Sequence, residues 1–200
     1  MGKDYQVNSD TILWNEFIQG NQEAFRVIYN SHVQSLYKYG CHITPDKELI
    51  KDCIQDVFID LSKYRSGLGA TNNIKLYLFK SLKLKIIKSL DKAGIFSSID
   101  KEMLPFQYMT SIEEELEEDE TLQMRNRHLE KAIESLSNRQ KEAIYLKFVS
   151  GLSYEEIGKT MKLNYQSARN LVFRGLEKLR ESLPKNIFMF FLQSGFTPLK

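Results

Sequence analysis

The stretch that decides the fold is residues 139–181, RQKEAIYLKFVSGLSYEEIGKTMKLNYQSARNLVFRGLEKLRE. It is typical of two short helices, a tight polar turn and a third helix. Ser153 can cap the middle helix, and Glu156, three residues later, can reach back to the cap nitrogen as in a capping box. Asn164 follows a short turn, and its side-chain oxygen can accept a hydrogen bond from the next helix. The pattern predicts a helix-turn-helix whose last helix starts near Tyr165.

The last helix of this stretch has two distinct faces. Apolar residues at three- and four-residue steps form a stripe that packs on the preceding helices, namely Ala168, Leu171, Val172, Leu176 and Leu179. The other face carries side chains that can pair with base edges and phosphates in the major groove. The alternative is an ordinary amphipathic surface helix, but the cap, the short turn and the basic face occur together, which favours DNA binding. The candidate DNA-binding residues are Gln166, Ser167, Arg169, Asn170, Phe173, Arg174 and Lys178.

Charged residues are unevenly distributed along the chain. The 200 residues carry a net charge of +2 and have the composition of a soluble, mostly helical protein. This length suffices for one domain or two small ones. Lysines crowd residues 75–92, whereas residues 113–120 (EEELEEDE) are almost wholly acidic. We therefore expect two basic modules that flank an acidic connector.

The cysteines and the termini exclude several classes of protein. Cys41 and Cys53 are the only cysteines and form no CxxC pair, which argues against a disulfide scaffold or a zinc site. Cys41 and His42 would make half a metal site at best, so we expect a packing cysteine and a surface histidine. No run reaches the ~20 apolar residues that span a bilayer, and the N-terminus lacks a secretion signal. The sequence predicts a cytoplasmic protein without membrane insertion, metal or cofactor.

Four helices are predicted in the first part of the chain, after a loose polar lead at residues 1–10. Turn-forming residues at Gly20-Asn21, at Thr44-Pro45-Asp46 and in the loop 66–73 separate them. The predicted helices are about 11–19, 22–42, 46–64 and 73–92. The third has an apolar core face and an acidic face; its core residues are Cys53, Ile54, Val57, Phe58 and Leu61.

The fourth predicted helix combines a core stripe with lysines and aromatic rings. Its stripe is Ile74, Leu78, Leu82 and Ile86, and Tyr77 and Phe79 are interleaved with the lysines. Cations can hold a nucleic-acid backbone while rings stack on exposed bases, so this helix is a candidate site for an unpaired strand. The alternative is a solvated lysine face with two core aromatics. The candidate residues are Tyr77, Lys80, Lys83, Lys85 and Lys88.

The predicted organisation is all-α, with two small helical domains. A four-helix domain at residues 11–92 is joined by a linker at 93–122 to a helix-turn-helix domain at 123–184. The acidic run within the linker is interpreted as a spacer rather than a helix. Residues 185–200 form a short apolar tail, which we expect to pack on the second domain or to bind a partner.

Residues 11–183 resemble the bacterial sigma-70 family, in its small extracytoplasmic-function (ECF) type. LSNRQKEAIYLKFVSGLSYEEIGKTM with SARNLVFRGLEKLRE is similar to region 4, which reads the promoter −35 element. DCIQDVFIDL is similar to region 2.2, whose polar face docks on the clamp helices of the polymerase β′ subunit. The resemblance implies that Val57 and Phe58 belong to the core. It implies polymerase contacts by Asp52, Gln55, Asp56 and Asp60.

The segment IKLYLFKSLKLKIIKSL occupies the place of regions 2.3 and 2.4, which capture and open the −10 element. The family commonly has Trp where Tyr77 stands and Asn where Leu84 stands. Tyr77 keeps a ring that can stack, whereas Leu84 keeps no amide. The resemblance implies a non-enzymatic sigma factor whose partners are core RNA polymerase (the β′ clamp helices and the β flap), promoter DNA and an anti-sigma factor.

Two other functions are compatible with a helix-turn-helix. One is a regulator that binds an operator without docking on polymerase, but an acidic, glutamine-containing helix serves no purpose there. The other is an enzyme that acts on nucleic acid, but no nucleophile or carboxylate cluster in a shaped pocket stands out, and the histidines are scattered. These histidines are His32, His42 and His128. We therefore expect a factor that brings core polymerase to a promoter and helps to separate the strands.

Overall fold

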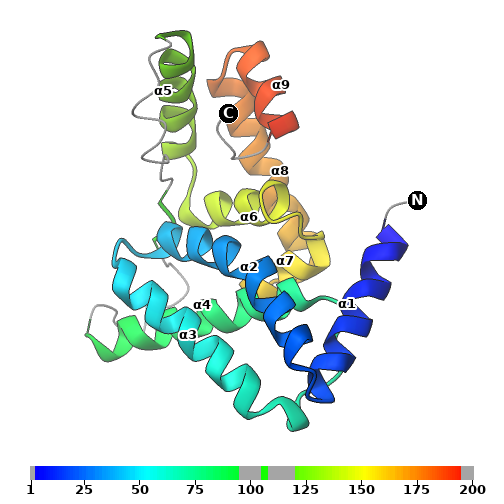
Figure 1. Cartoon of the computed structure of the whole chain (residues 1–200). Helices are drawn as coiled ribbons and strands as arrows, with labels where there is room; N and C mark the ends of the chain where they lie inside the picture. The colour runs from blue at the N-terminus through cyan, green and yellow to red at the C-terminus, as the bar shows by residue number, and fades with distance from the viewer. Residues whose placement is uncertain (1–2, 95–104, 108–119, 195–200) are drawn as a thin grey trace. The chain divides into compact units, whose positions relative to one another are not determined.

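The computed structural model describes residues 3–94, 105–107 and 120–194. Within these ranges the secondary structure consists of nine α-helices and one 3-10 turn, with no strand (Figure 1). The all-α class is confirmed. The chain divides into two compact units, Met1–Lys101 and Glu102–Lys200. The exact domain borders stay predictions, and the acidic run at 113–120 lies almost wholly outside the described residues.

The first unit contains four of these helices, and side-chain oxygens cap three of them. Asn21 accepts hydrogen bonds from the backbone of the second helix, and Asp46 accepts one from that of the third, at 3.0 Å from Leu49 N. Asn73 does the same for the fourth, at 2.7 Å from Leu76 N. The helices begin where these caps predict. They are α1 (Lys3–Ile18), α2 (Gln22–Ile43), α3 (Lys47–Lys63) and α4 (Ile74–Lys92), with the 3-10 turn η1 (Arg65–Gly67) after α3.

Helix α1 begins at Lys3, so the prediction of a loose lead at residues 1–10 was wrong. Hydrogen bonds to residues far away in the sequence fix the position of this helix. The Asp10 carboxylate accepts a hydrogen bond from the backbone N–H of Ile74 at 3.0 Å. The indole of Trp14, which is almost completely buried, donates to the carbonyl of Gly69 at 3.0 Å. Local periodicity could not reveal these anchors, because both partners lie more than fifty residues away.

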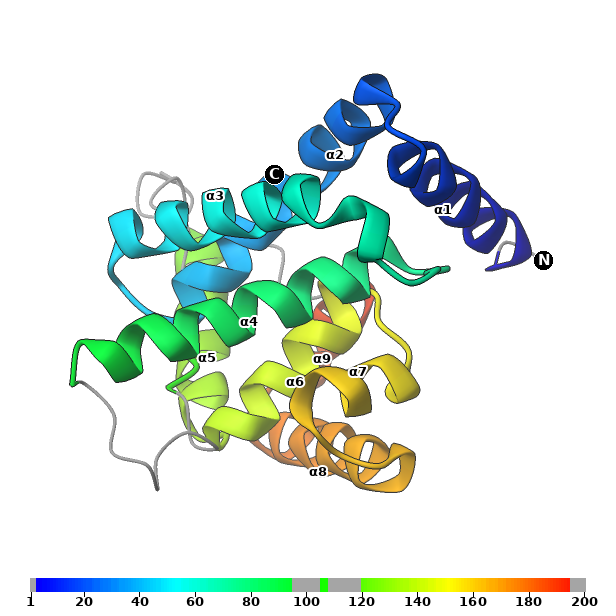
Figure 2. The same cartoon turned by 90° about the horizontal axis from the view of Figure 1, so that it is seen from below.

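The core of the first unit lies where α2, α3 and α4 pack on one another (Figure 2). The predicted apolar face of α3 and the predicted stripe of α4 are both buried, which confirms these two assignments. A further aromatic pair, Tyr39 of α2 and Phe79 of α4, lies within this core at 4.9 Å between ring centroids.

The second unit contains the predicted helix-turn-helix. Ser153 and Glu156 form a complete capping box, with Ser153 N to Glu156 Oε2 at 2.7 Å. Asn164 caps the last helix of the motif through its side-chain oxygen, 2.7 Å from Ser167 N. The motif is therefore confirmed. The helices of this unit are α5 (Glu120–Glu134), α6 (Asn138–Phe148), α7 (Tyr154–Met161), α8 (Tyr165–Ser182) and α9 (Lys185–Ser194).

The turn between α7 and α8 depends on Gly158. The backbone N–H of Leu163 donates to the carbonyl of Gly158 at 2.8 Å, and Lys162 takes a left-handed conformation with φ 55°. This geometry brings the Leu163 carbonyl so close that a Cβ at position 158 would lie 2.6 Å from it. Glycine is therefore needed at this position for the backbones to approach.

Residues 185–194 form the helix α9. Its Phe191 is fully buried and contacts Phe148 of α6, with ring centroids 5.9 Å apart. The first described part of the apolar tail therefore packs on the second unit, which was one of the two expected outcomes. Residues 195–200 lie outside the described residues.

Candidate nucleic-acid and protein interfaces

Helix α8 presents most of its candidate DNA-binding residues to solvent. Its stripe packs inward, with Ala168, Val172 and Leu179 fully buried and Leu171 and Leu176 partly buried. The Gln166 amide donates to the Asn170 side-chain oxygen at 3.1 Å, one turn along the helix. Ser167 is half-buried beside the cap, and Phe173 is 59% exposed. The exposed candidates on this face are Gln166, Arg169, Asn170, Phe173, Arg174 and Lys178.

Lys178 differs from the other candidates on α8. Its ammonium group donates to the backbone carbonyl of Ser135 at 3.0 Å, just beyond the end of α5. The side chain thereby satisfies a carbonyl at a helix C-terminus. In this structure Lys178 links α8 to the α5–α6 connection, a role that the basic pattern alone did not predict.

An aromatic and cationic contact supports the start of α8. The rings of Tyr154 and Tyr165 meet edge to face, with centroids 5.9 Å apart. Lys147 lies over the Tyr154 ring at 4.7 Å and also donates to the Leu152 carbonyl at 3.3 Å. Tyr165 is half exposed at the first position of α8. Tyr165 was not among the candidates predicted from sequence, although its place directly after the cap at Asn164 puts it at the start of the exposed face of α8.

On α4 the structure separates the two aromatic residues. Tyr77 is half-buried, and its ring packs on Trp14 at 5.2 Å between centroids. Phe79 is buried in the core, which agrees with the alternative of a core aromatic for this ring, whereas Tyr77 stays partly exposed. Lys80 and Lys88 are exposed, whereas Lys83 and Lys85 are partly buried. Leu84, the position where the family commonly has Asn, is 49% exposed.

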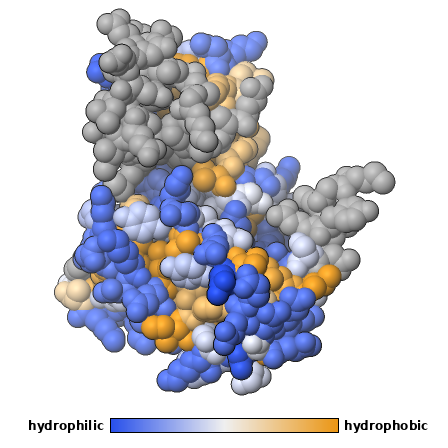
Figure 3. Space-filling model, in the orientation of Figure 1, coloured by the Kyte–Doolittle hydropathy of each residue, from blue (hydrophilic) through white to orange (hydrophobic). Residues whose placement is uncertain are grey.

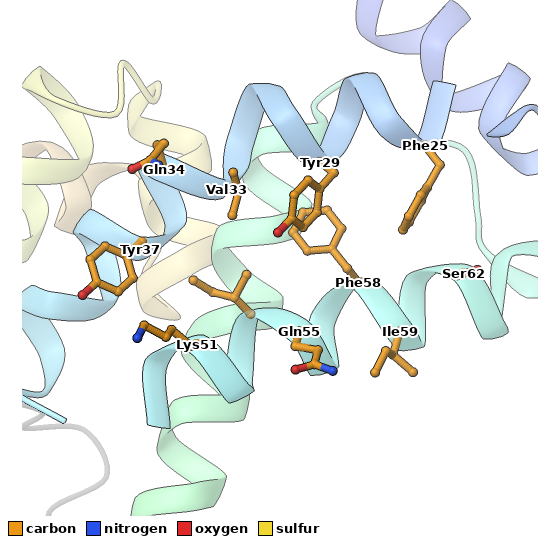
Figure 4. A pocket seen from close by; sticks show the side chains of 11 residues that line it. Phe25, Tyr29, Val33, Gln34, Tyr37, Lys51, Gln55, Phe58, Ile59 and Ser62 are labelled. Atoms are coloured by element: carbon orange, nitrogen blue, oxygen red, sulfur yellow. The ribbon is translucent and has the colours of Figure 1, made fainter. Parts of the chain in front are cut away.

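The four candidate polymerase-binding residues on α3 are all exposed. Gln55 lies at a groove beside α2, whereas Asp56 and Asp60 face α4. Gln55 lines an open groove of about 740 Å³ between α2 and α3 (Figure 4). Aromatic rings form much of its floor, including the pair Tyr29 and Phe58 at 4.8 Å between centroids. Ile59 adds an apolar side chain that is 50% exposed. The exposed residues are Asp52, Gln55, Asp56 and Asp60.

This groove places apolar surface beside polar side chains. Figure 3 shows hydrophobic surface exposed on the first unit, where α2 and α3 lie. The groove could not be predicted from local sequence patterns, because its walls come from two helices. Apolar residues outside the helical stripes, such as Tyr29 and Ile59, were the available signal.

The other two carboxylates of α3 face α4. The Lys85 ammonium lies 2.7 Å from Asp60 Oδ2 and 3.7 Å from Asp56 Oδ2. Partial burial lowers the pKa of Lys85, but the hydrogen bond and charge of Asp60, with those of Asp56, more than offset this and raise it above the ordinary lysine value. Residues predicted for two separate sites, a polymerase site and a DNA site, are therefore in direct contact.

Both cysteines and His42 are at least partly buried. Burial raises the pKa of both the Cys41 and Cys53 thiols, and the Cys53 sulfur lies 3.6 Å from Ser89 Oγ. His42 is only 8% exposed, so the expectation of a surface histidine was wrong. Within the described ranges, no three His, Cys, Asp or Glu side chains are grouped to hold a metal ion. Among the described helices, none has the length and apolar character to cross a membrane.

Comparisons with known proteins match both the helix-turn-helix and the longer chain. Residues 127–179 match the family model described as "Sigma-70, region 4". The ECF RNA polymerase sigma factor SigX of Bacillus subtilis (strain 168) is 24% identical over 169 residues, which cover 81% of this chain and 84% of that protein. The RNA polymerase sigma factor CarQ of Myxococcus xanthus is 24% identical over 167 residues, covering 84% and 93%.

Two solved structures have a similar fold. CnrH in complex with the cytosolic domain of CnrY aligns with a TM-score of 0.55 at 17% identity and covers 86% of this chain and 95% of that one. The sigma factor RpoE in complex with the anti-sigma factor NepR, from Bartonella quintana, aligns with a TM-score of 0.57 at 19% identity. That alignment covers 79% of this chain and 95% of RpoE. At these identities the likeness concerns the fold.

Proposed function

Because this chain belongs to the sigma-70 family of RNA polymerase sigma factors, in its ECF type, and directs promoter recognition, we propose a separate binding role for each of three helices. Helix α8 contacts the −35 element as duplex DNA, α3 binds core RNA polymerase, and α4 holds the opened −10 element. The family is not enzymatic, so the chain acts by binding alone. The protein then works in the cytoplasm, where core polymerase and promoter DNA are found.

The role of α8 is supported by the division of this helix into a buried stripe and an exposed polar face. This is the observation that carries the proposal. Arg169 and Asn170 have the side chains that pair with guanine and adenine edges in the major groove. Arg174, one turn further along, is suited to a phosphate, which fixes register without reading sequence.

The role of α3 is supported by its exposed carboxylates and by the groove beside Gln55. A helix of the polymerase can lay an apolar side chain over the aromatic floor while its basic residues meet Asp52 and its neighbours. A regulator that binds an operator without docking on polymerase does not require such a surface. The surface therefore favours the sigma factor over that alternative.

Strand separation follows from preferential binding to the melted state. A protein that binds unpaired bases better than paired ones shifts the promoter toward the open form by that difference in affinity. Tyr77 offers part of its ring for stacking, and the exposed ammonium groups of Lys80 and Lys88 can hold phosphates. Leu84 brings an apolar group where the family has an amide, so we expect contact with a base face there rather than a hydrogen bond.

A protein that covers the same surfaces would regulate this factor. RpoE was solved with the anti-sigma factor NepR, and CnrH with the cytosolic domain of CnrY. By analogy we include an anti-sigma factor among the partners of this chain. The exposed groove between α2 and α3 offers apolar area for such a partner.

Size-exclusion co-elution with core RNA polymerase from the source bacterium tests the role of α3. We expect the wild-type chain to co-elute and an Asp52→Asn/Gln55→Ala variant to lose this, because the first change removes a negative charge from the exposed face of α3 and the second removes a polar group that lines the groove. Glu23→Ala is the matched control, since Glu23 is an exposed acidic residue on α2. Equal co-elution of the double variant would disprove the role of α3. A wild-type chain that bound duplex DNA alone and never polymerase would favour the operator-binding regulator.

Promoter binding by the reconstituted holoenzyme tests the role of α8. Arg174→Ala should weaken binding across all sequences and reduce the slope of log K against log[salt] by ~0.9, as expected for one lost phosphate contact. Arg169→Ala should cost ~1–3 kcal/mol and relax preference at one base pair. If both variants bound like wild type, another surface would have to read the −35 element.

A further inference from the structure

Lys85 lies apart from Lys80 and Lys88, the two exposed candidate cations of α4. At about 100° per residue, Tyr77, Lys80, Leu84 and Lys88 fall within an arc of roughly 80° on the helix surface. Lys85 points about 60° outside this arc. Its side chain is 25% exposed and reaches across to α3, where it contacts both Asp60 and Asp56. The geometry therefore assigns Lys85 to the α3 side of the helix pair.

The two carboxylates that Lys85 contacts need a cation. Asp56 and Asp60 are one turn apart on α3, where like charges repel and destabilise a helix. Their side chains are 65% and 51% exposed, so each could take several rotamers without a partner. The Lys85 ammonium lies between them and offsets this repulsion. It also limits the directions in which both carboxylates can point.

We propose that Lys85 is a positioning residue of the polymerase-binding helix and not a DNA-binding residue. Helix α3 then presents two edges: an apolar edge at the groove, with Gln55 and Ile59, and a charged edge at α4, with Asp56 and Asp60 held by Lys85. The partner of the charged edge is a basic side chain of the polymerase that meets pre-oriented carboxylates. This inference rests on the proposed role of α3 and corrects the assignment of Lys85 made from sequence.

The salt dependence of promoter binding separates Lys85 from the true phosphate contacts. The holoenzyme with Lys80→Met or Lys88→Met should lose ~0.7–0.9 from the slope of log K against log[salt], because each lysine releases about one counterion. The holoenzyme with Lys85→Met should keep the wild-type slope. A slope that fell with Lys85→Met as it does with Lys88→Met would overturn the proposal.

A double-mutant cycle on core binding tests the positive part of the proposal. Lys85→Met should weaken the affinity of the full chain for core polymerase by up to about fivefold, the range of a partly exposed ion pair. Lys85→Arg, which keeps a cation, should largely retain wild-type affinity. In an Asp60→Asn background the effect of Lys85→Met should shrink, since one of the two carboxylates is gone. Unchanged affinity in Lys85→Met would overturn the positioning role.

Unfolding of the chain alone tests the ion pair of Lys85 independently of polymerase binding. Trp14 is the single tryptophan, so its fluorescence reports the unfolding of the first unit. The same cycle between Lys85 and Asp60 should give non-additive shifts in the unfolding midpoint. If Asp52→Asn/Gln55→Ala left core binding intact while this cycle showed coupling, the role of α3 would fail but the ion pair would stand. Additive midpoint shifts would refute the ion pair itself.

Discussion

Replacement of Gly158 by alanine should loosen the helix-turn-helix while leaving the first unit unchanged. A Cβ at this position would lie 2.6 Å from the carbonyl oxygen of Leu163, which belongs to the backbone and cannot rotate away. The turn must open by several tenths of an ångström to admit it. The hydrogen bond from Leu163 N to the Gly158 carbonyl, at 2.8 Å, should weaken as a result.

Two opposing terms set the size of the effect. Overpacking by one methyl group costs ~1–3 kcal/mol, whereas alanine is favoured over glycine inside a helix by about 1 kcal/mol. Because the contacting atom belongs to the backbone, we take the upper part of the overpacking range, ~2–3 kcal/mol, so the second unit should lose about 1–2 kcal/mol of unfolding free energy. Gly175→Ala is the matched control, because its Cβ would meet the Cδ1 end of the Ile144 side chain at the same 2.6 Å. A side-chain end can shift more easily, so this variant should change stability less.

Urea denaturation with two probes measures this prediction. Far-UV circular dichroism follows both units, whereas Trp14 fluorescence follows only the first. With a slope of ~1–3 kcal/mol/M in urea, the second-unit midpoint should fall by about 0.3–2 M in Gly158→Ala, and the Trp14 midpoint should stay in place. Binding of the holoenzyme to the −35 element should weaken too, because the turn orients α8. Unchanged or increased stability of Gly158→Ala, or a loss as large in Gly175→Ala, would refute the reasoning.

Three further predictions concern a titrating histidine, a helix cap and the C-terminal helix. Burial lowers the pKa of His32 below its ordinary value, although the charge of Asp10 opposes this. The unfolded chain then binds the proton more readily, so the first unit should lose stability as pH falls from about 6.5 through the lower pKa of the folded state. His32→Gln should remove this component of the pH dependence of the Trp14 unfolding midpoint, and an unaltered pH profile would contradict the prediction. Asn164→Ala removes the cap of α8 and should lower the unfolding free energy of the second unit, followed by circular dichroism, by ~0.5–2 kcal/mol. Asn164→Gly should lower it less, and a larger loss with glycine than with alanine would argue against the cap. Phe191→Ala should lower the same unfolding free energy by ~3–5 kcal/mol, because Phe191 is fully buried. Met189 is exposed, so Met189→Ala should be nearly neutral. Equal effects of the two substitutions would show that α9 does not pack as described.

The structural elements predicted correctly from sequence are those whose determinants lie close together in the chain. The capping box of Ser153 and Glu156 and the cap at Asn164 join residues three apart, so their spacing alone predicted the helix-turn-helix. The core faces of α3 and α4 follow from a periodicity of three and four residues. The resemblance to ECF sigma factors depended on the same local patterns, in regions 2.2 and 4, and the comparisons confirmed it.

Contacts between distant residues decided the rest. The hydrogen bond between Asp10 and Ile74 spans 64 residues and anchors α1, which no local pattern indicated. The aromatic groove needs walls from both α2 and α3. Phe79 is buried and Lys85 is paired because α4 turns those positions toward its neighbours, whereas their residue types suit a nucleic-acid surface equally well. Sequence by itself determined the helices α2 to α4, the helix-turn-helix with its caps, and the likeness to ECF sigma factors, since these depend on interactions within a few residues. Only the tertiary structure decided where α1 begins and which charged and aromatic side chains remain available for a partner, because that depends on what each helix packs against.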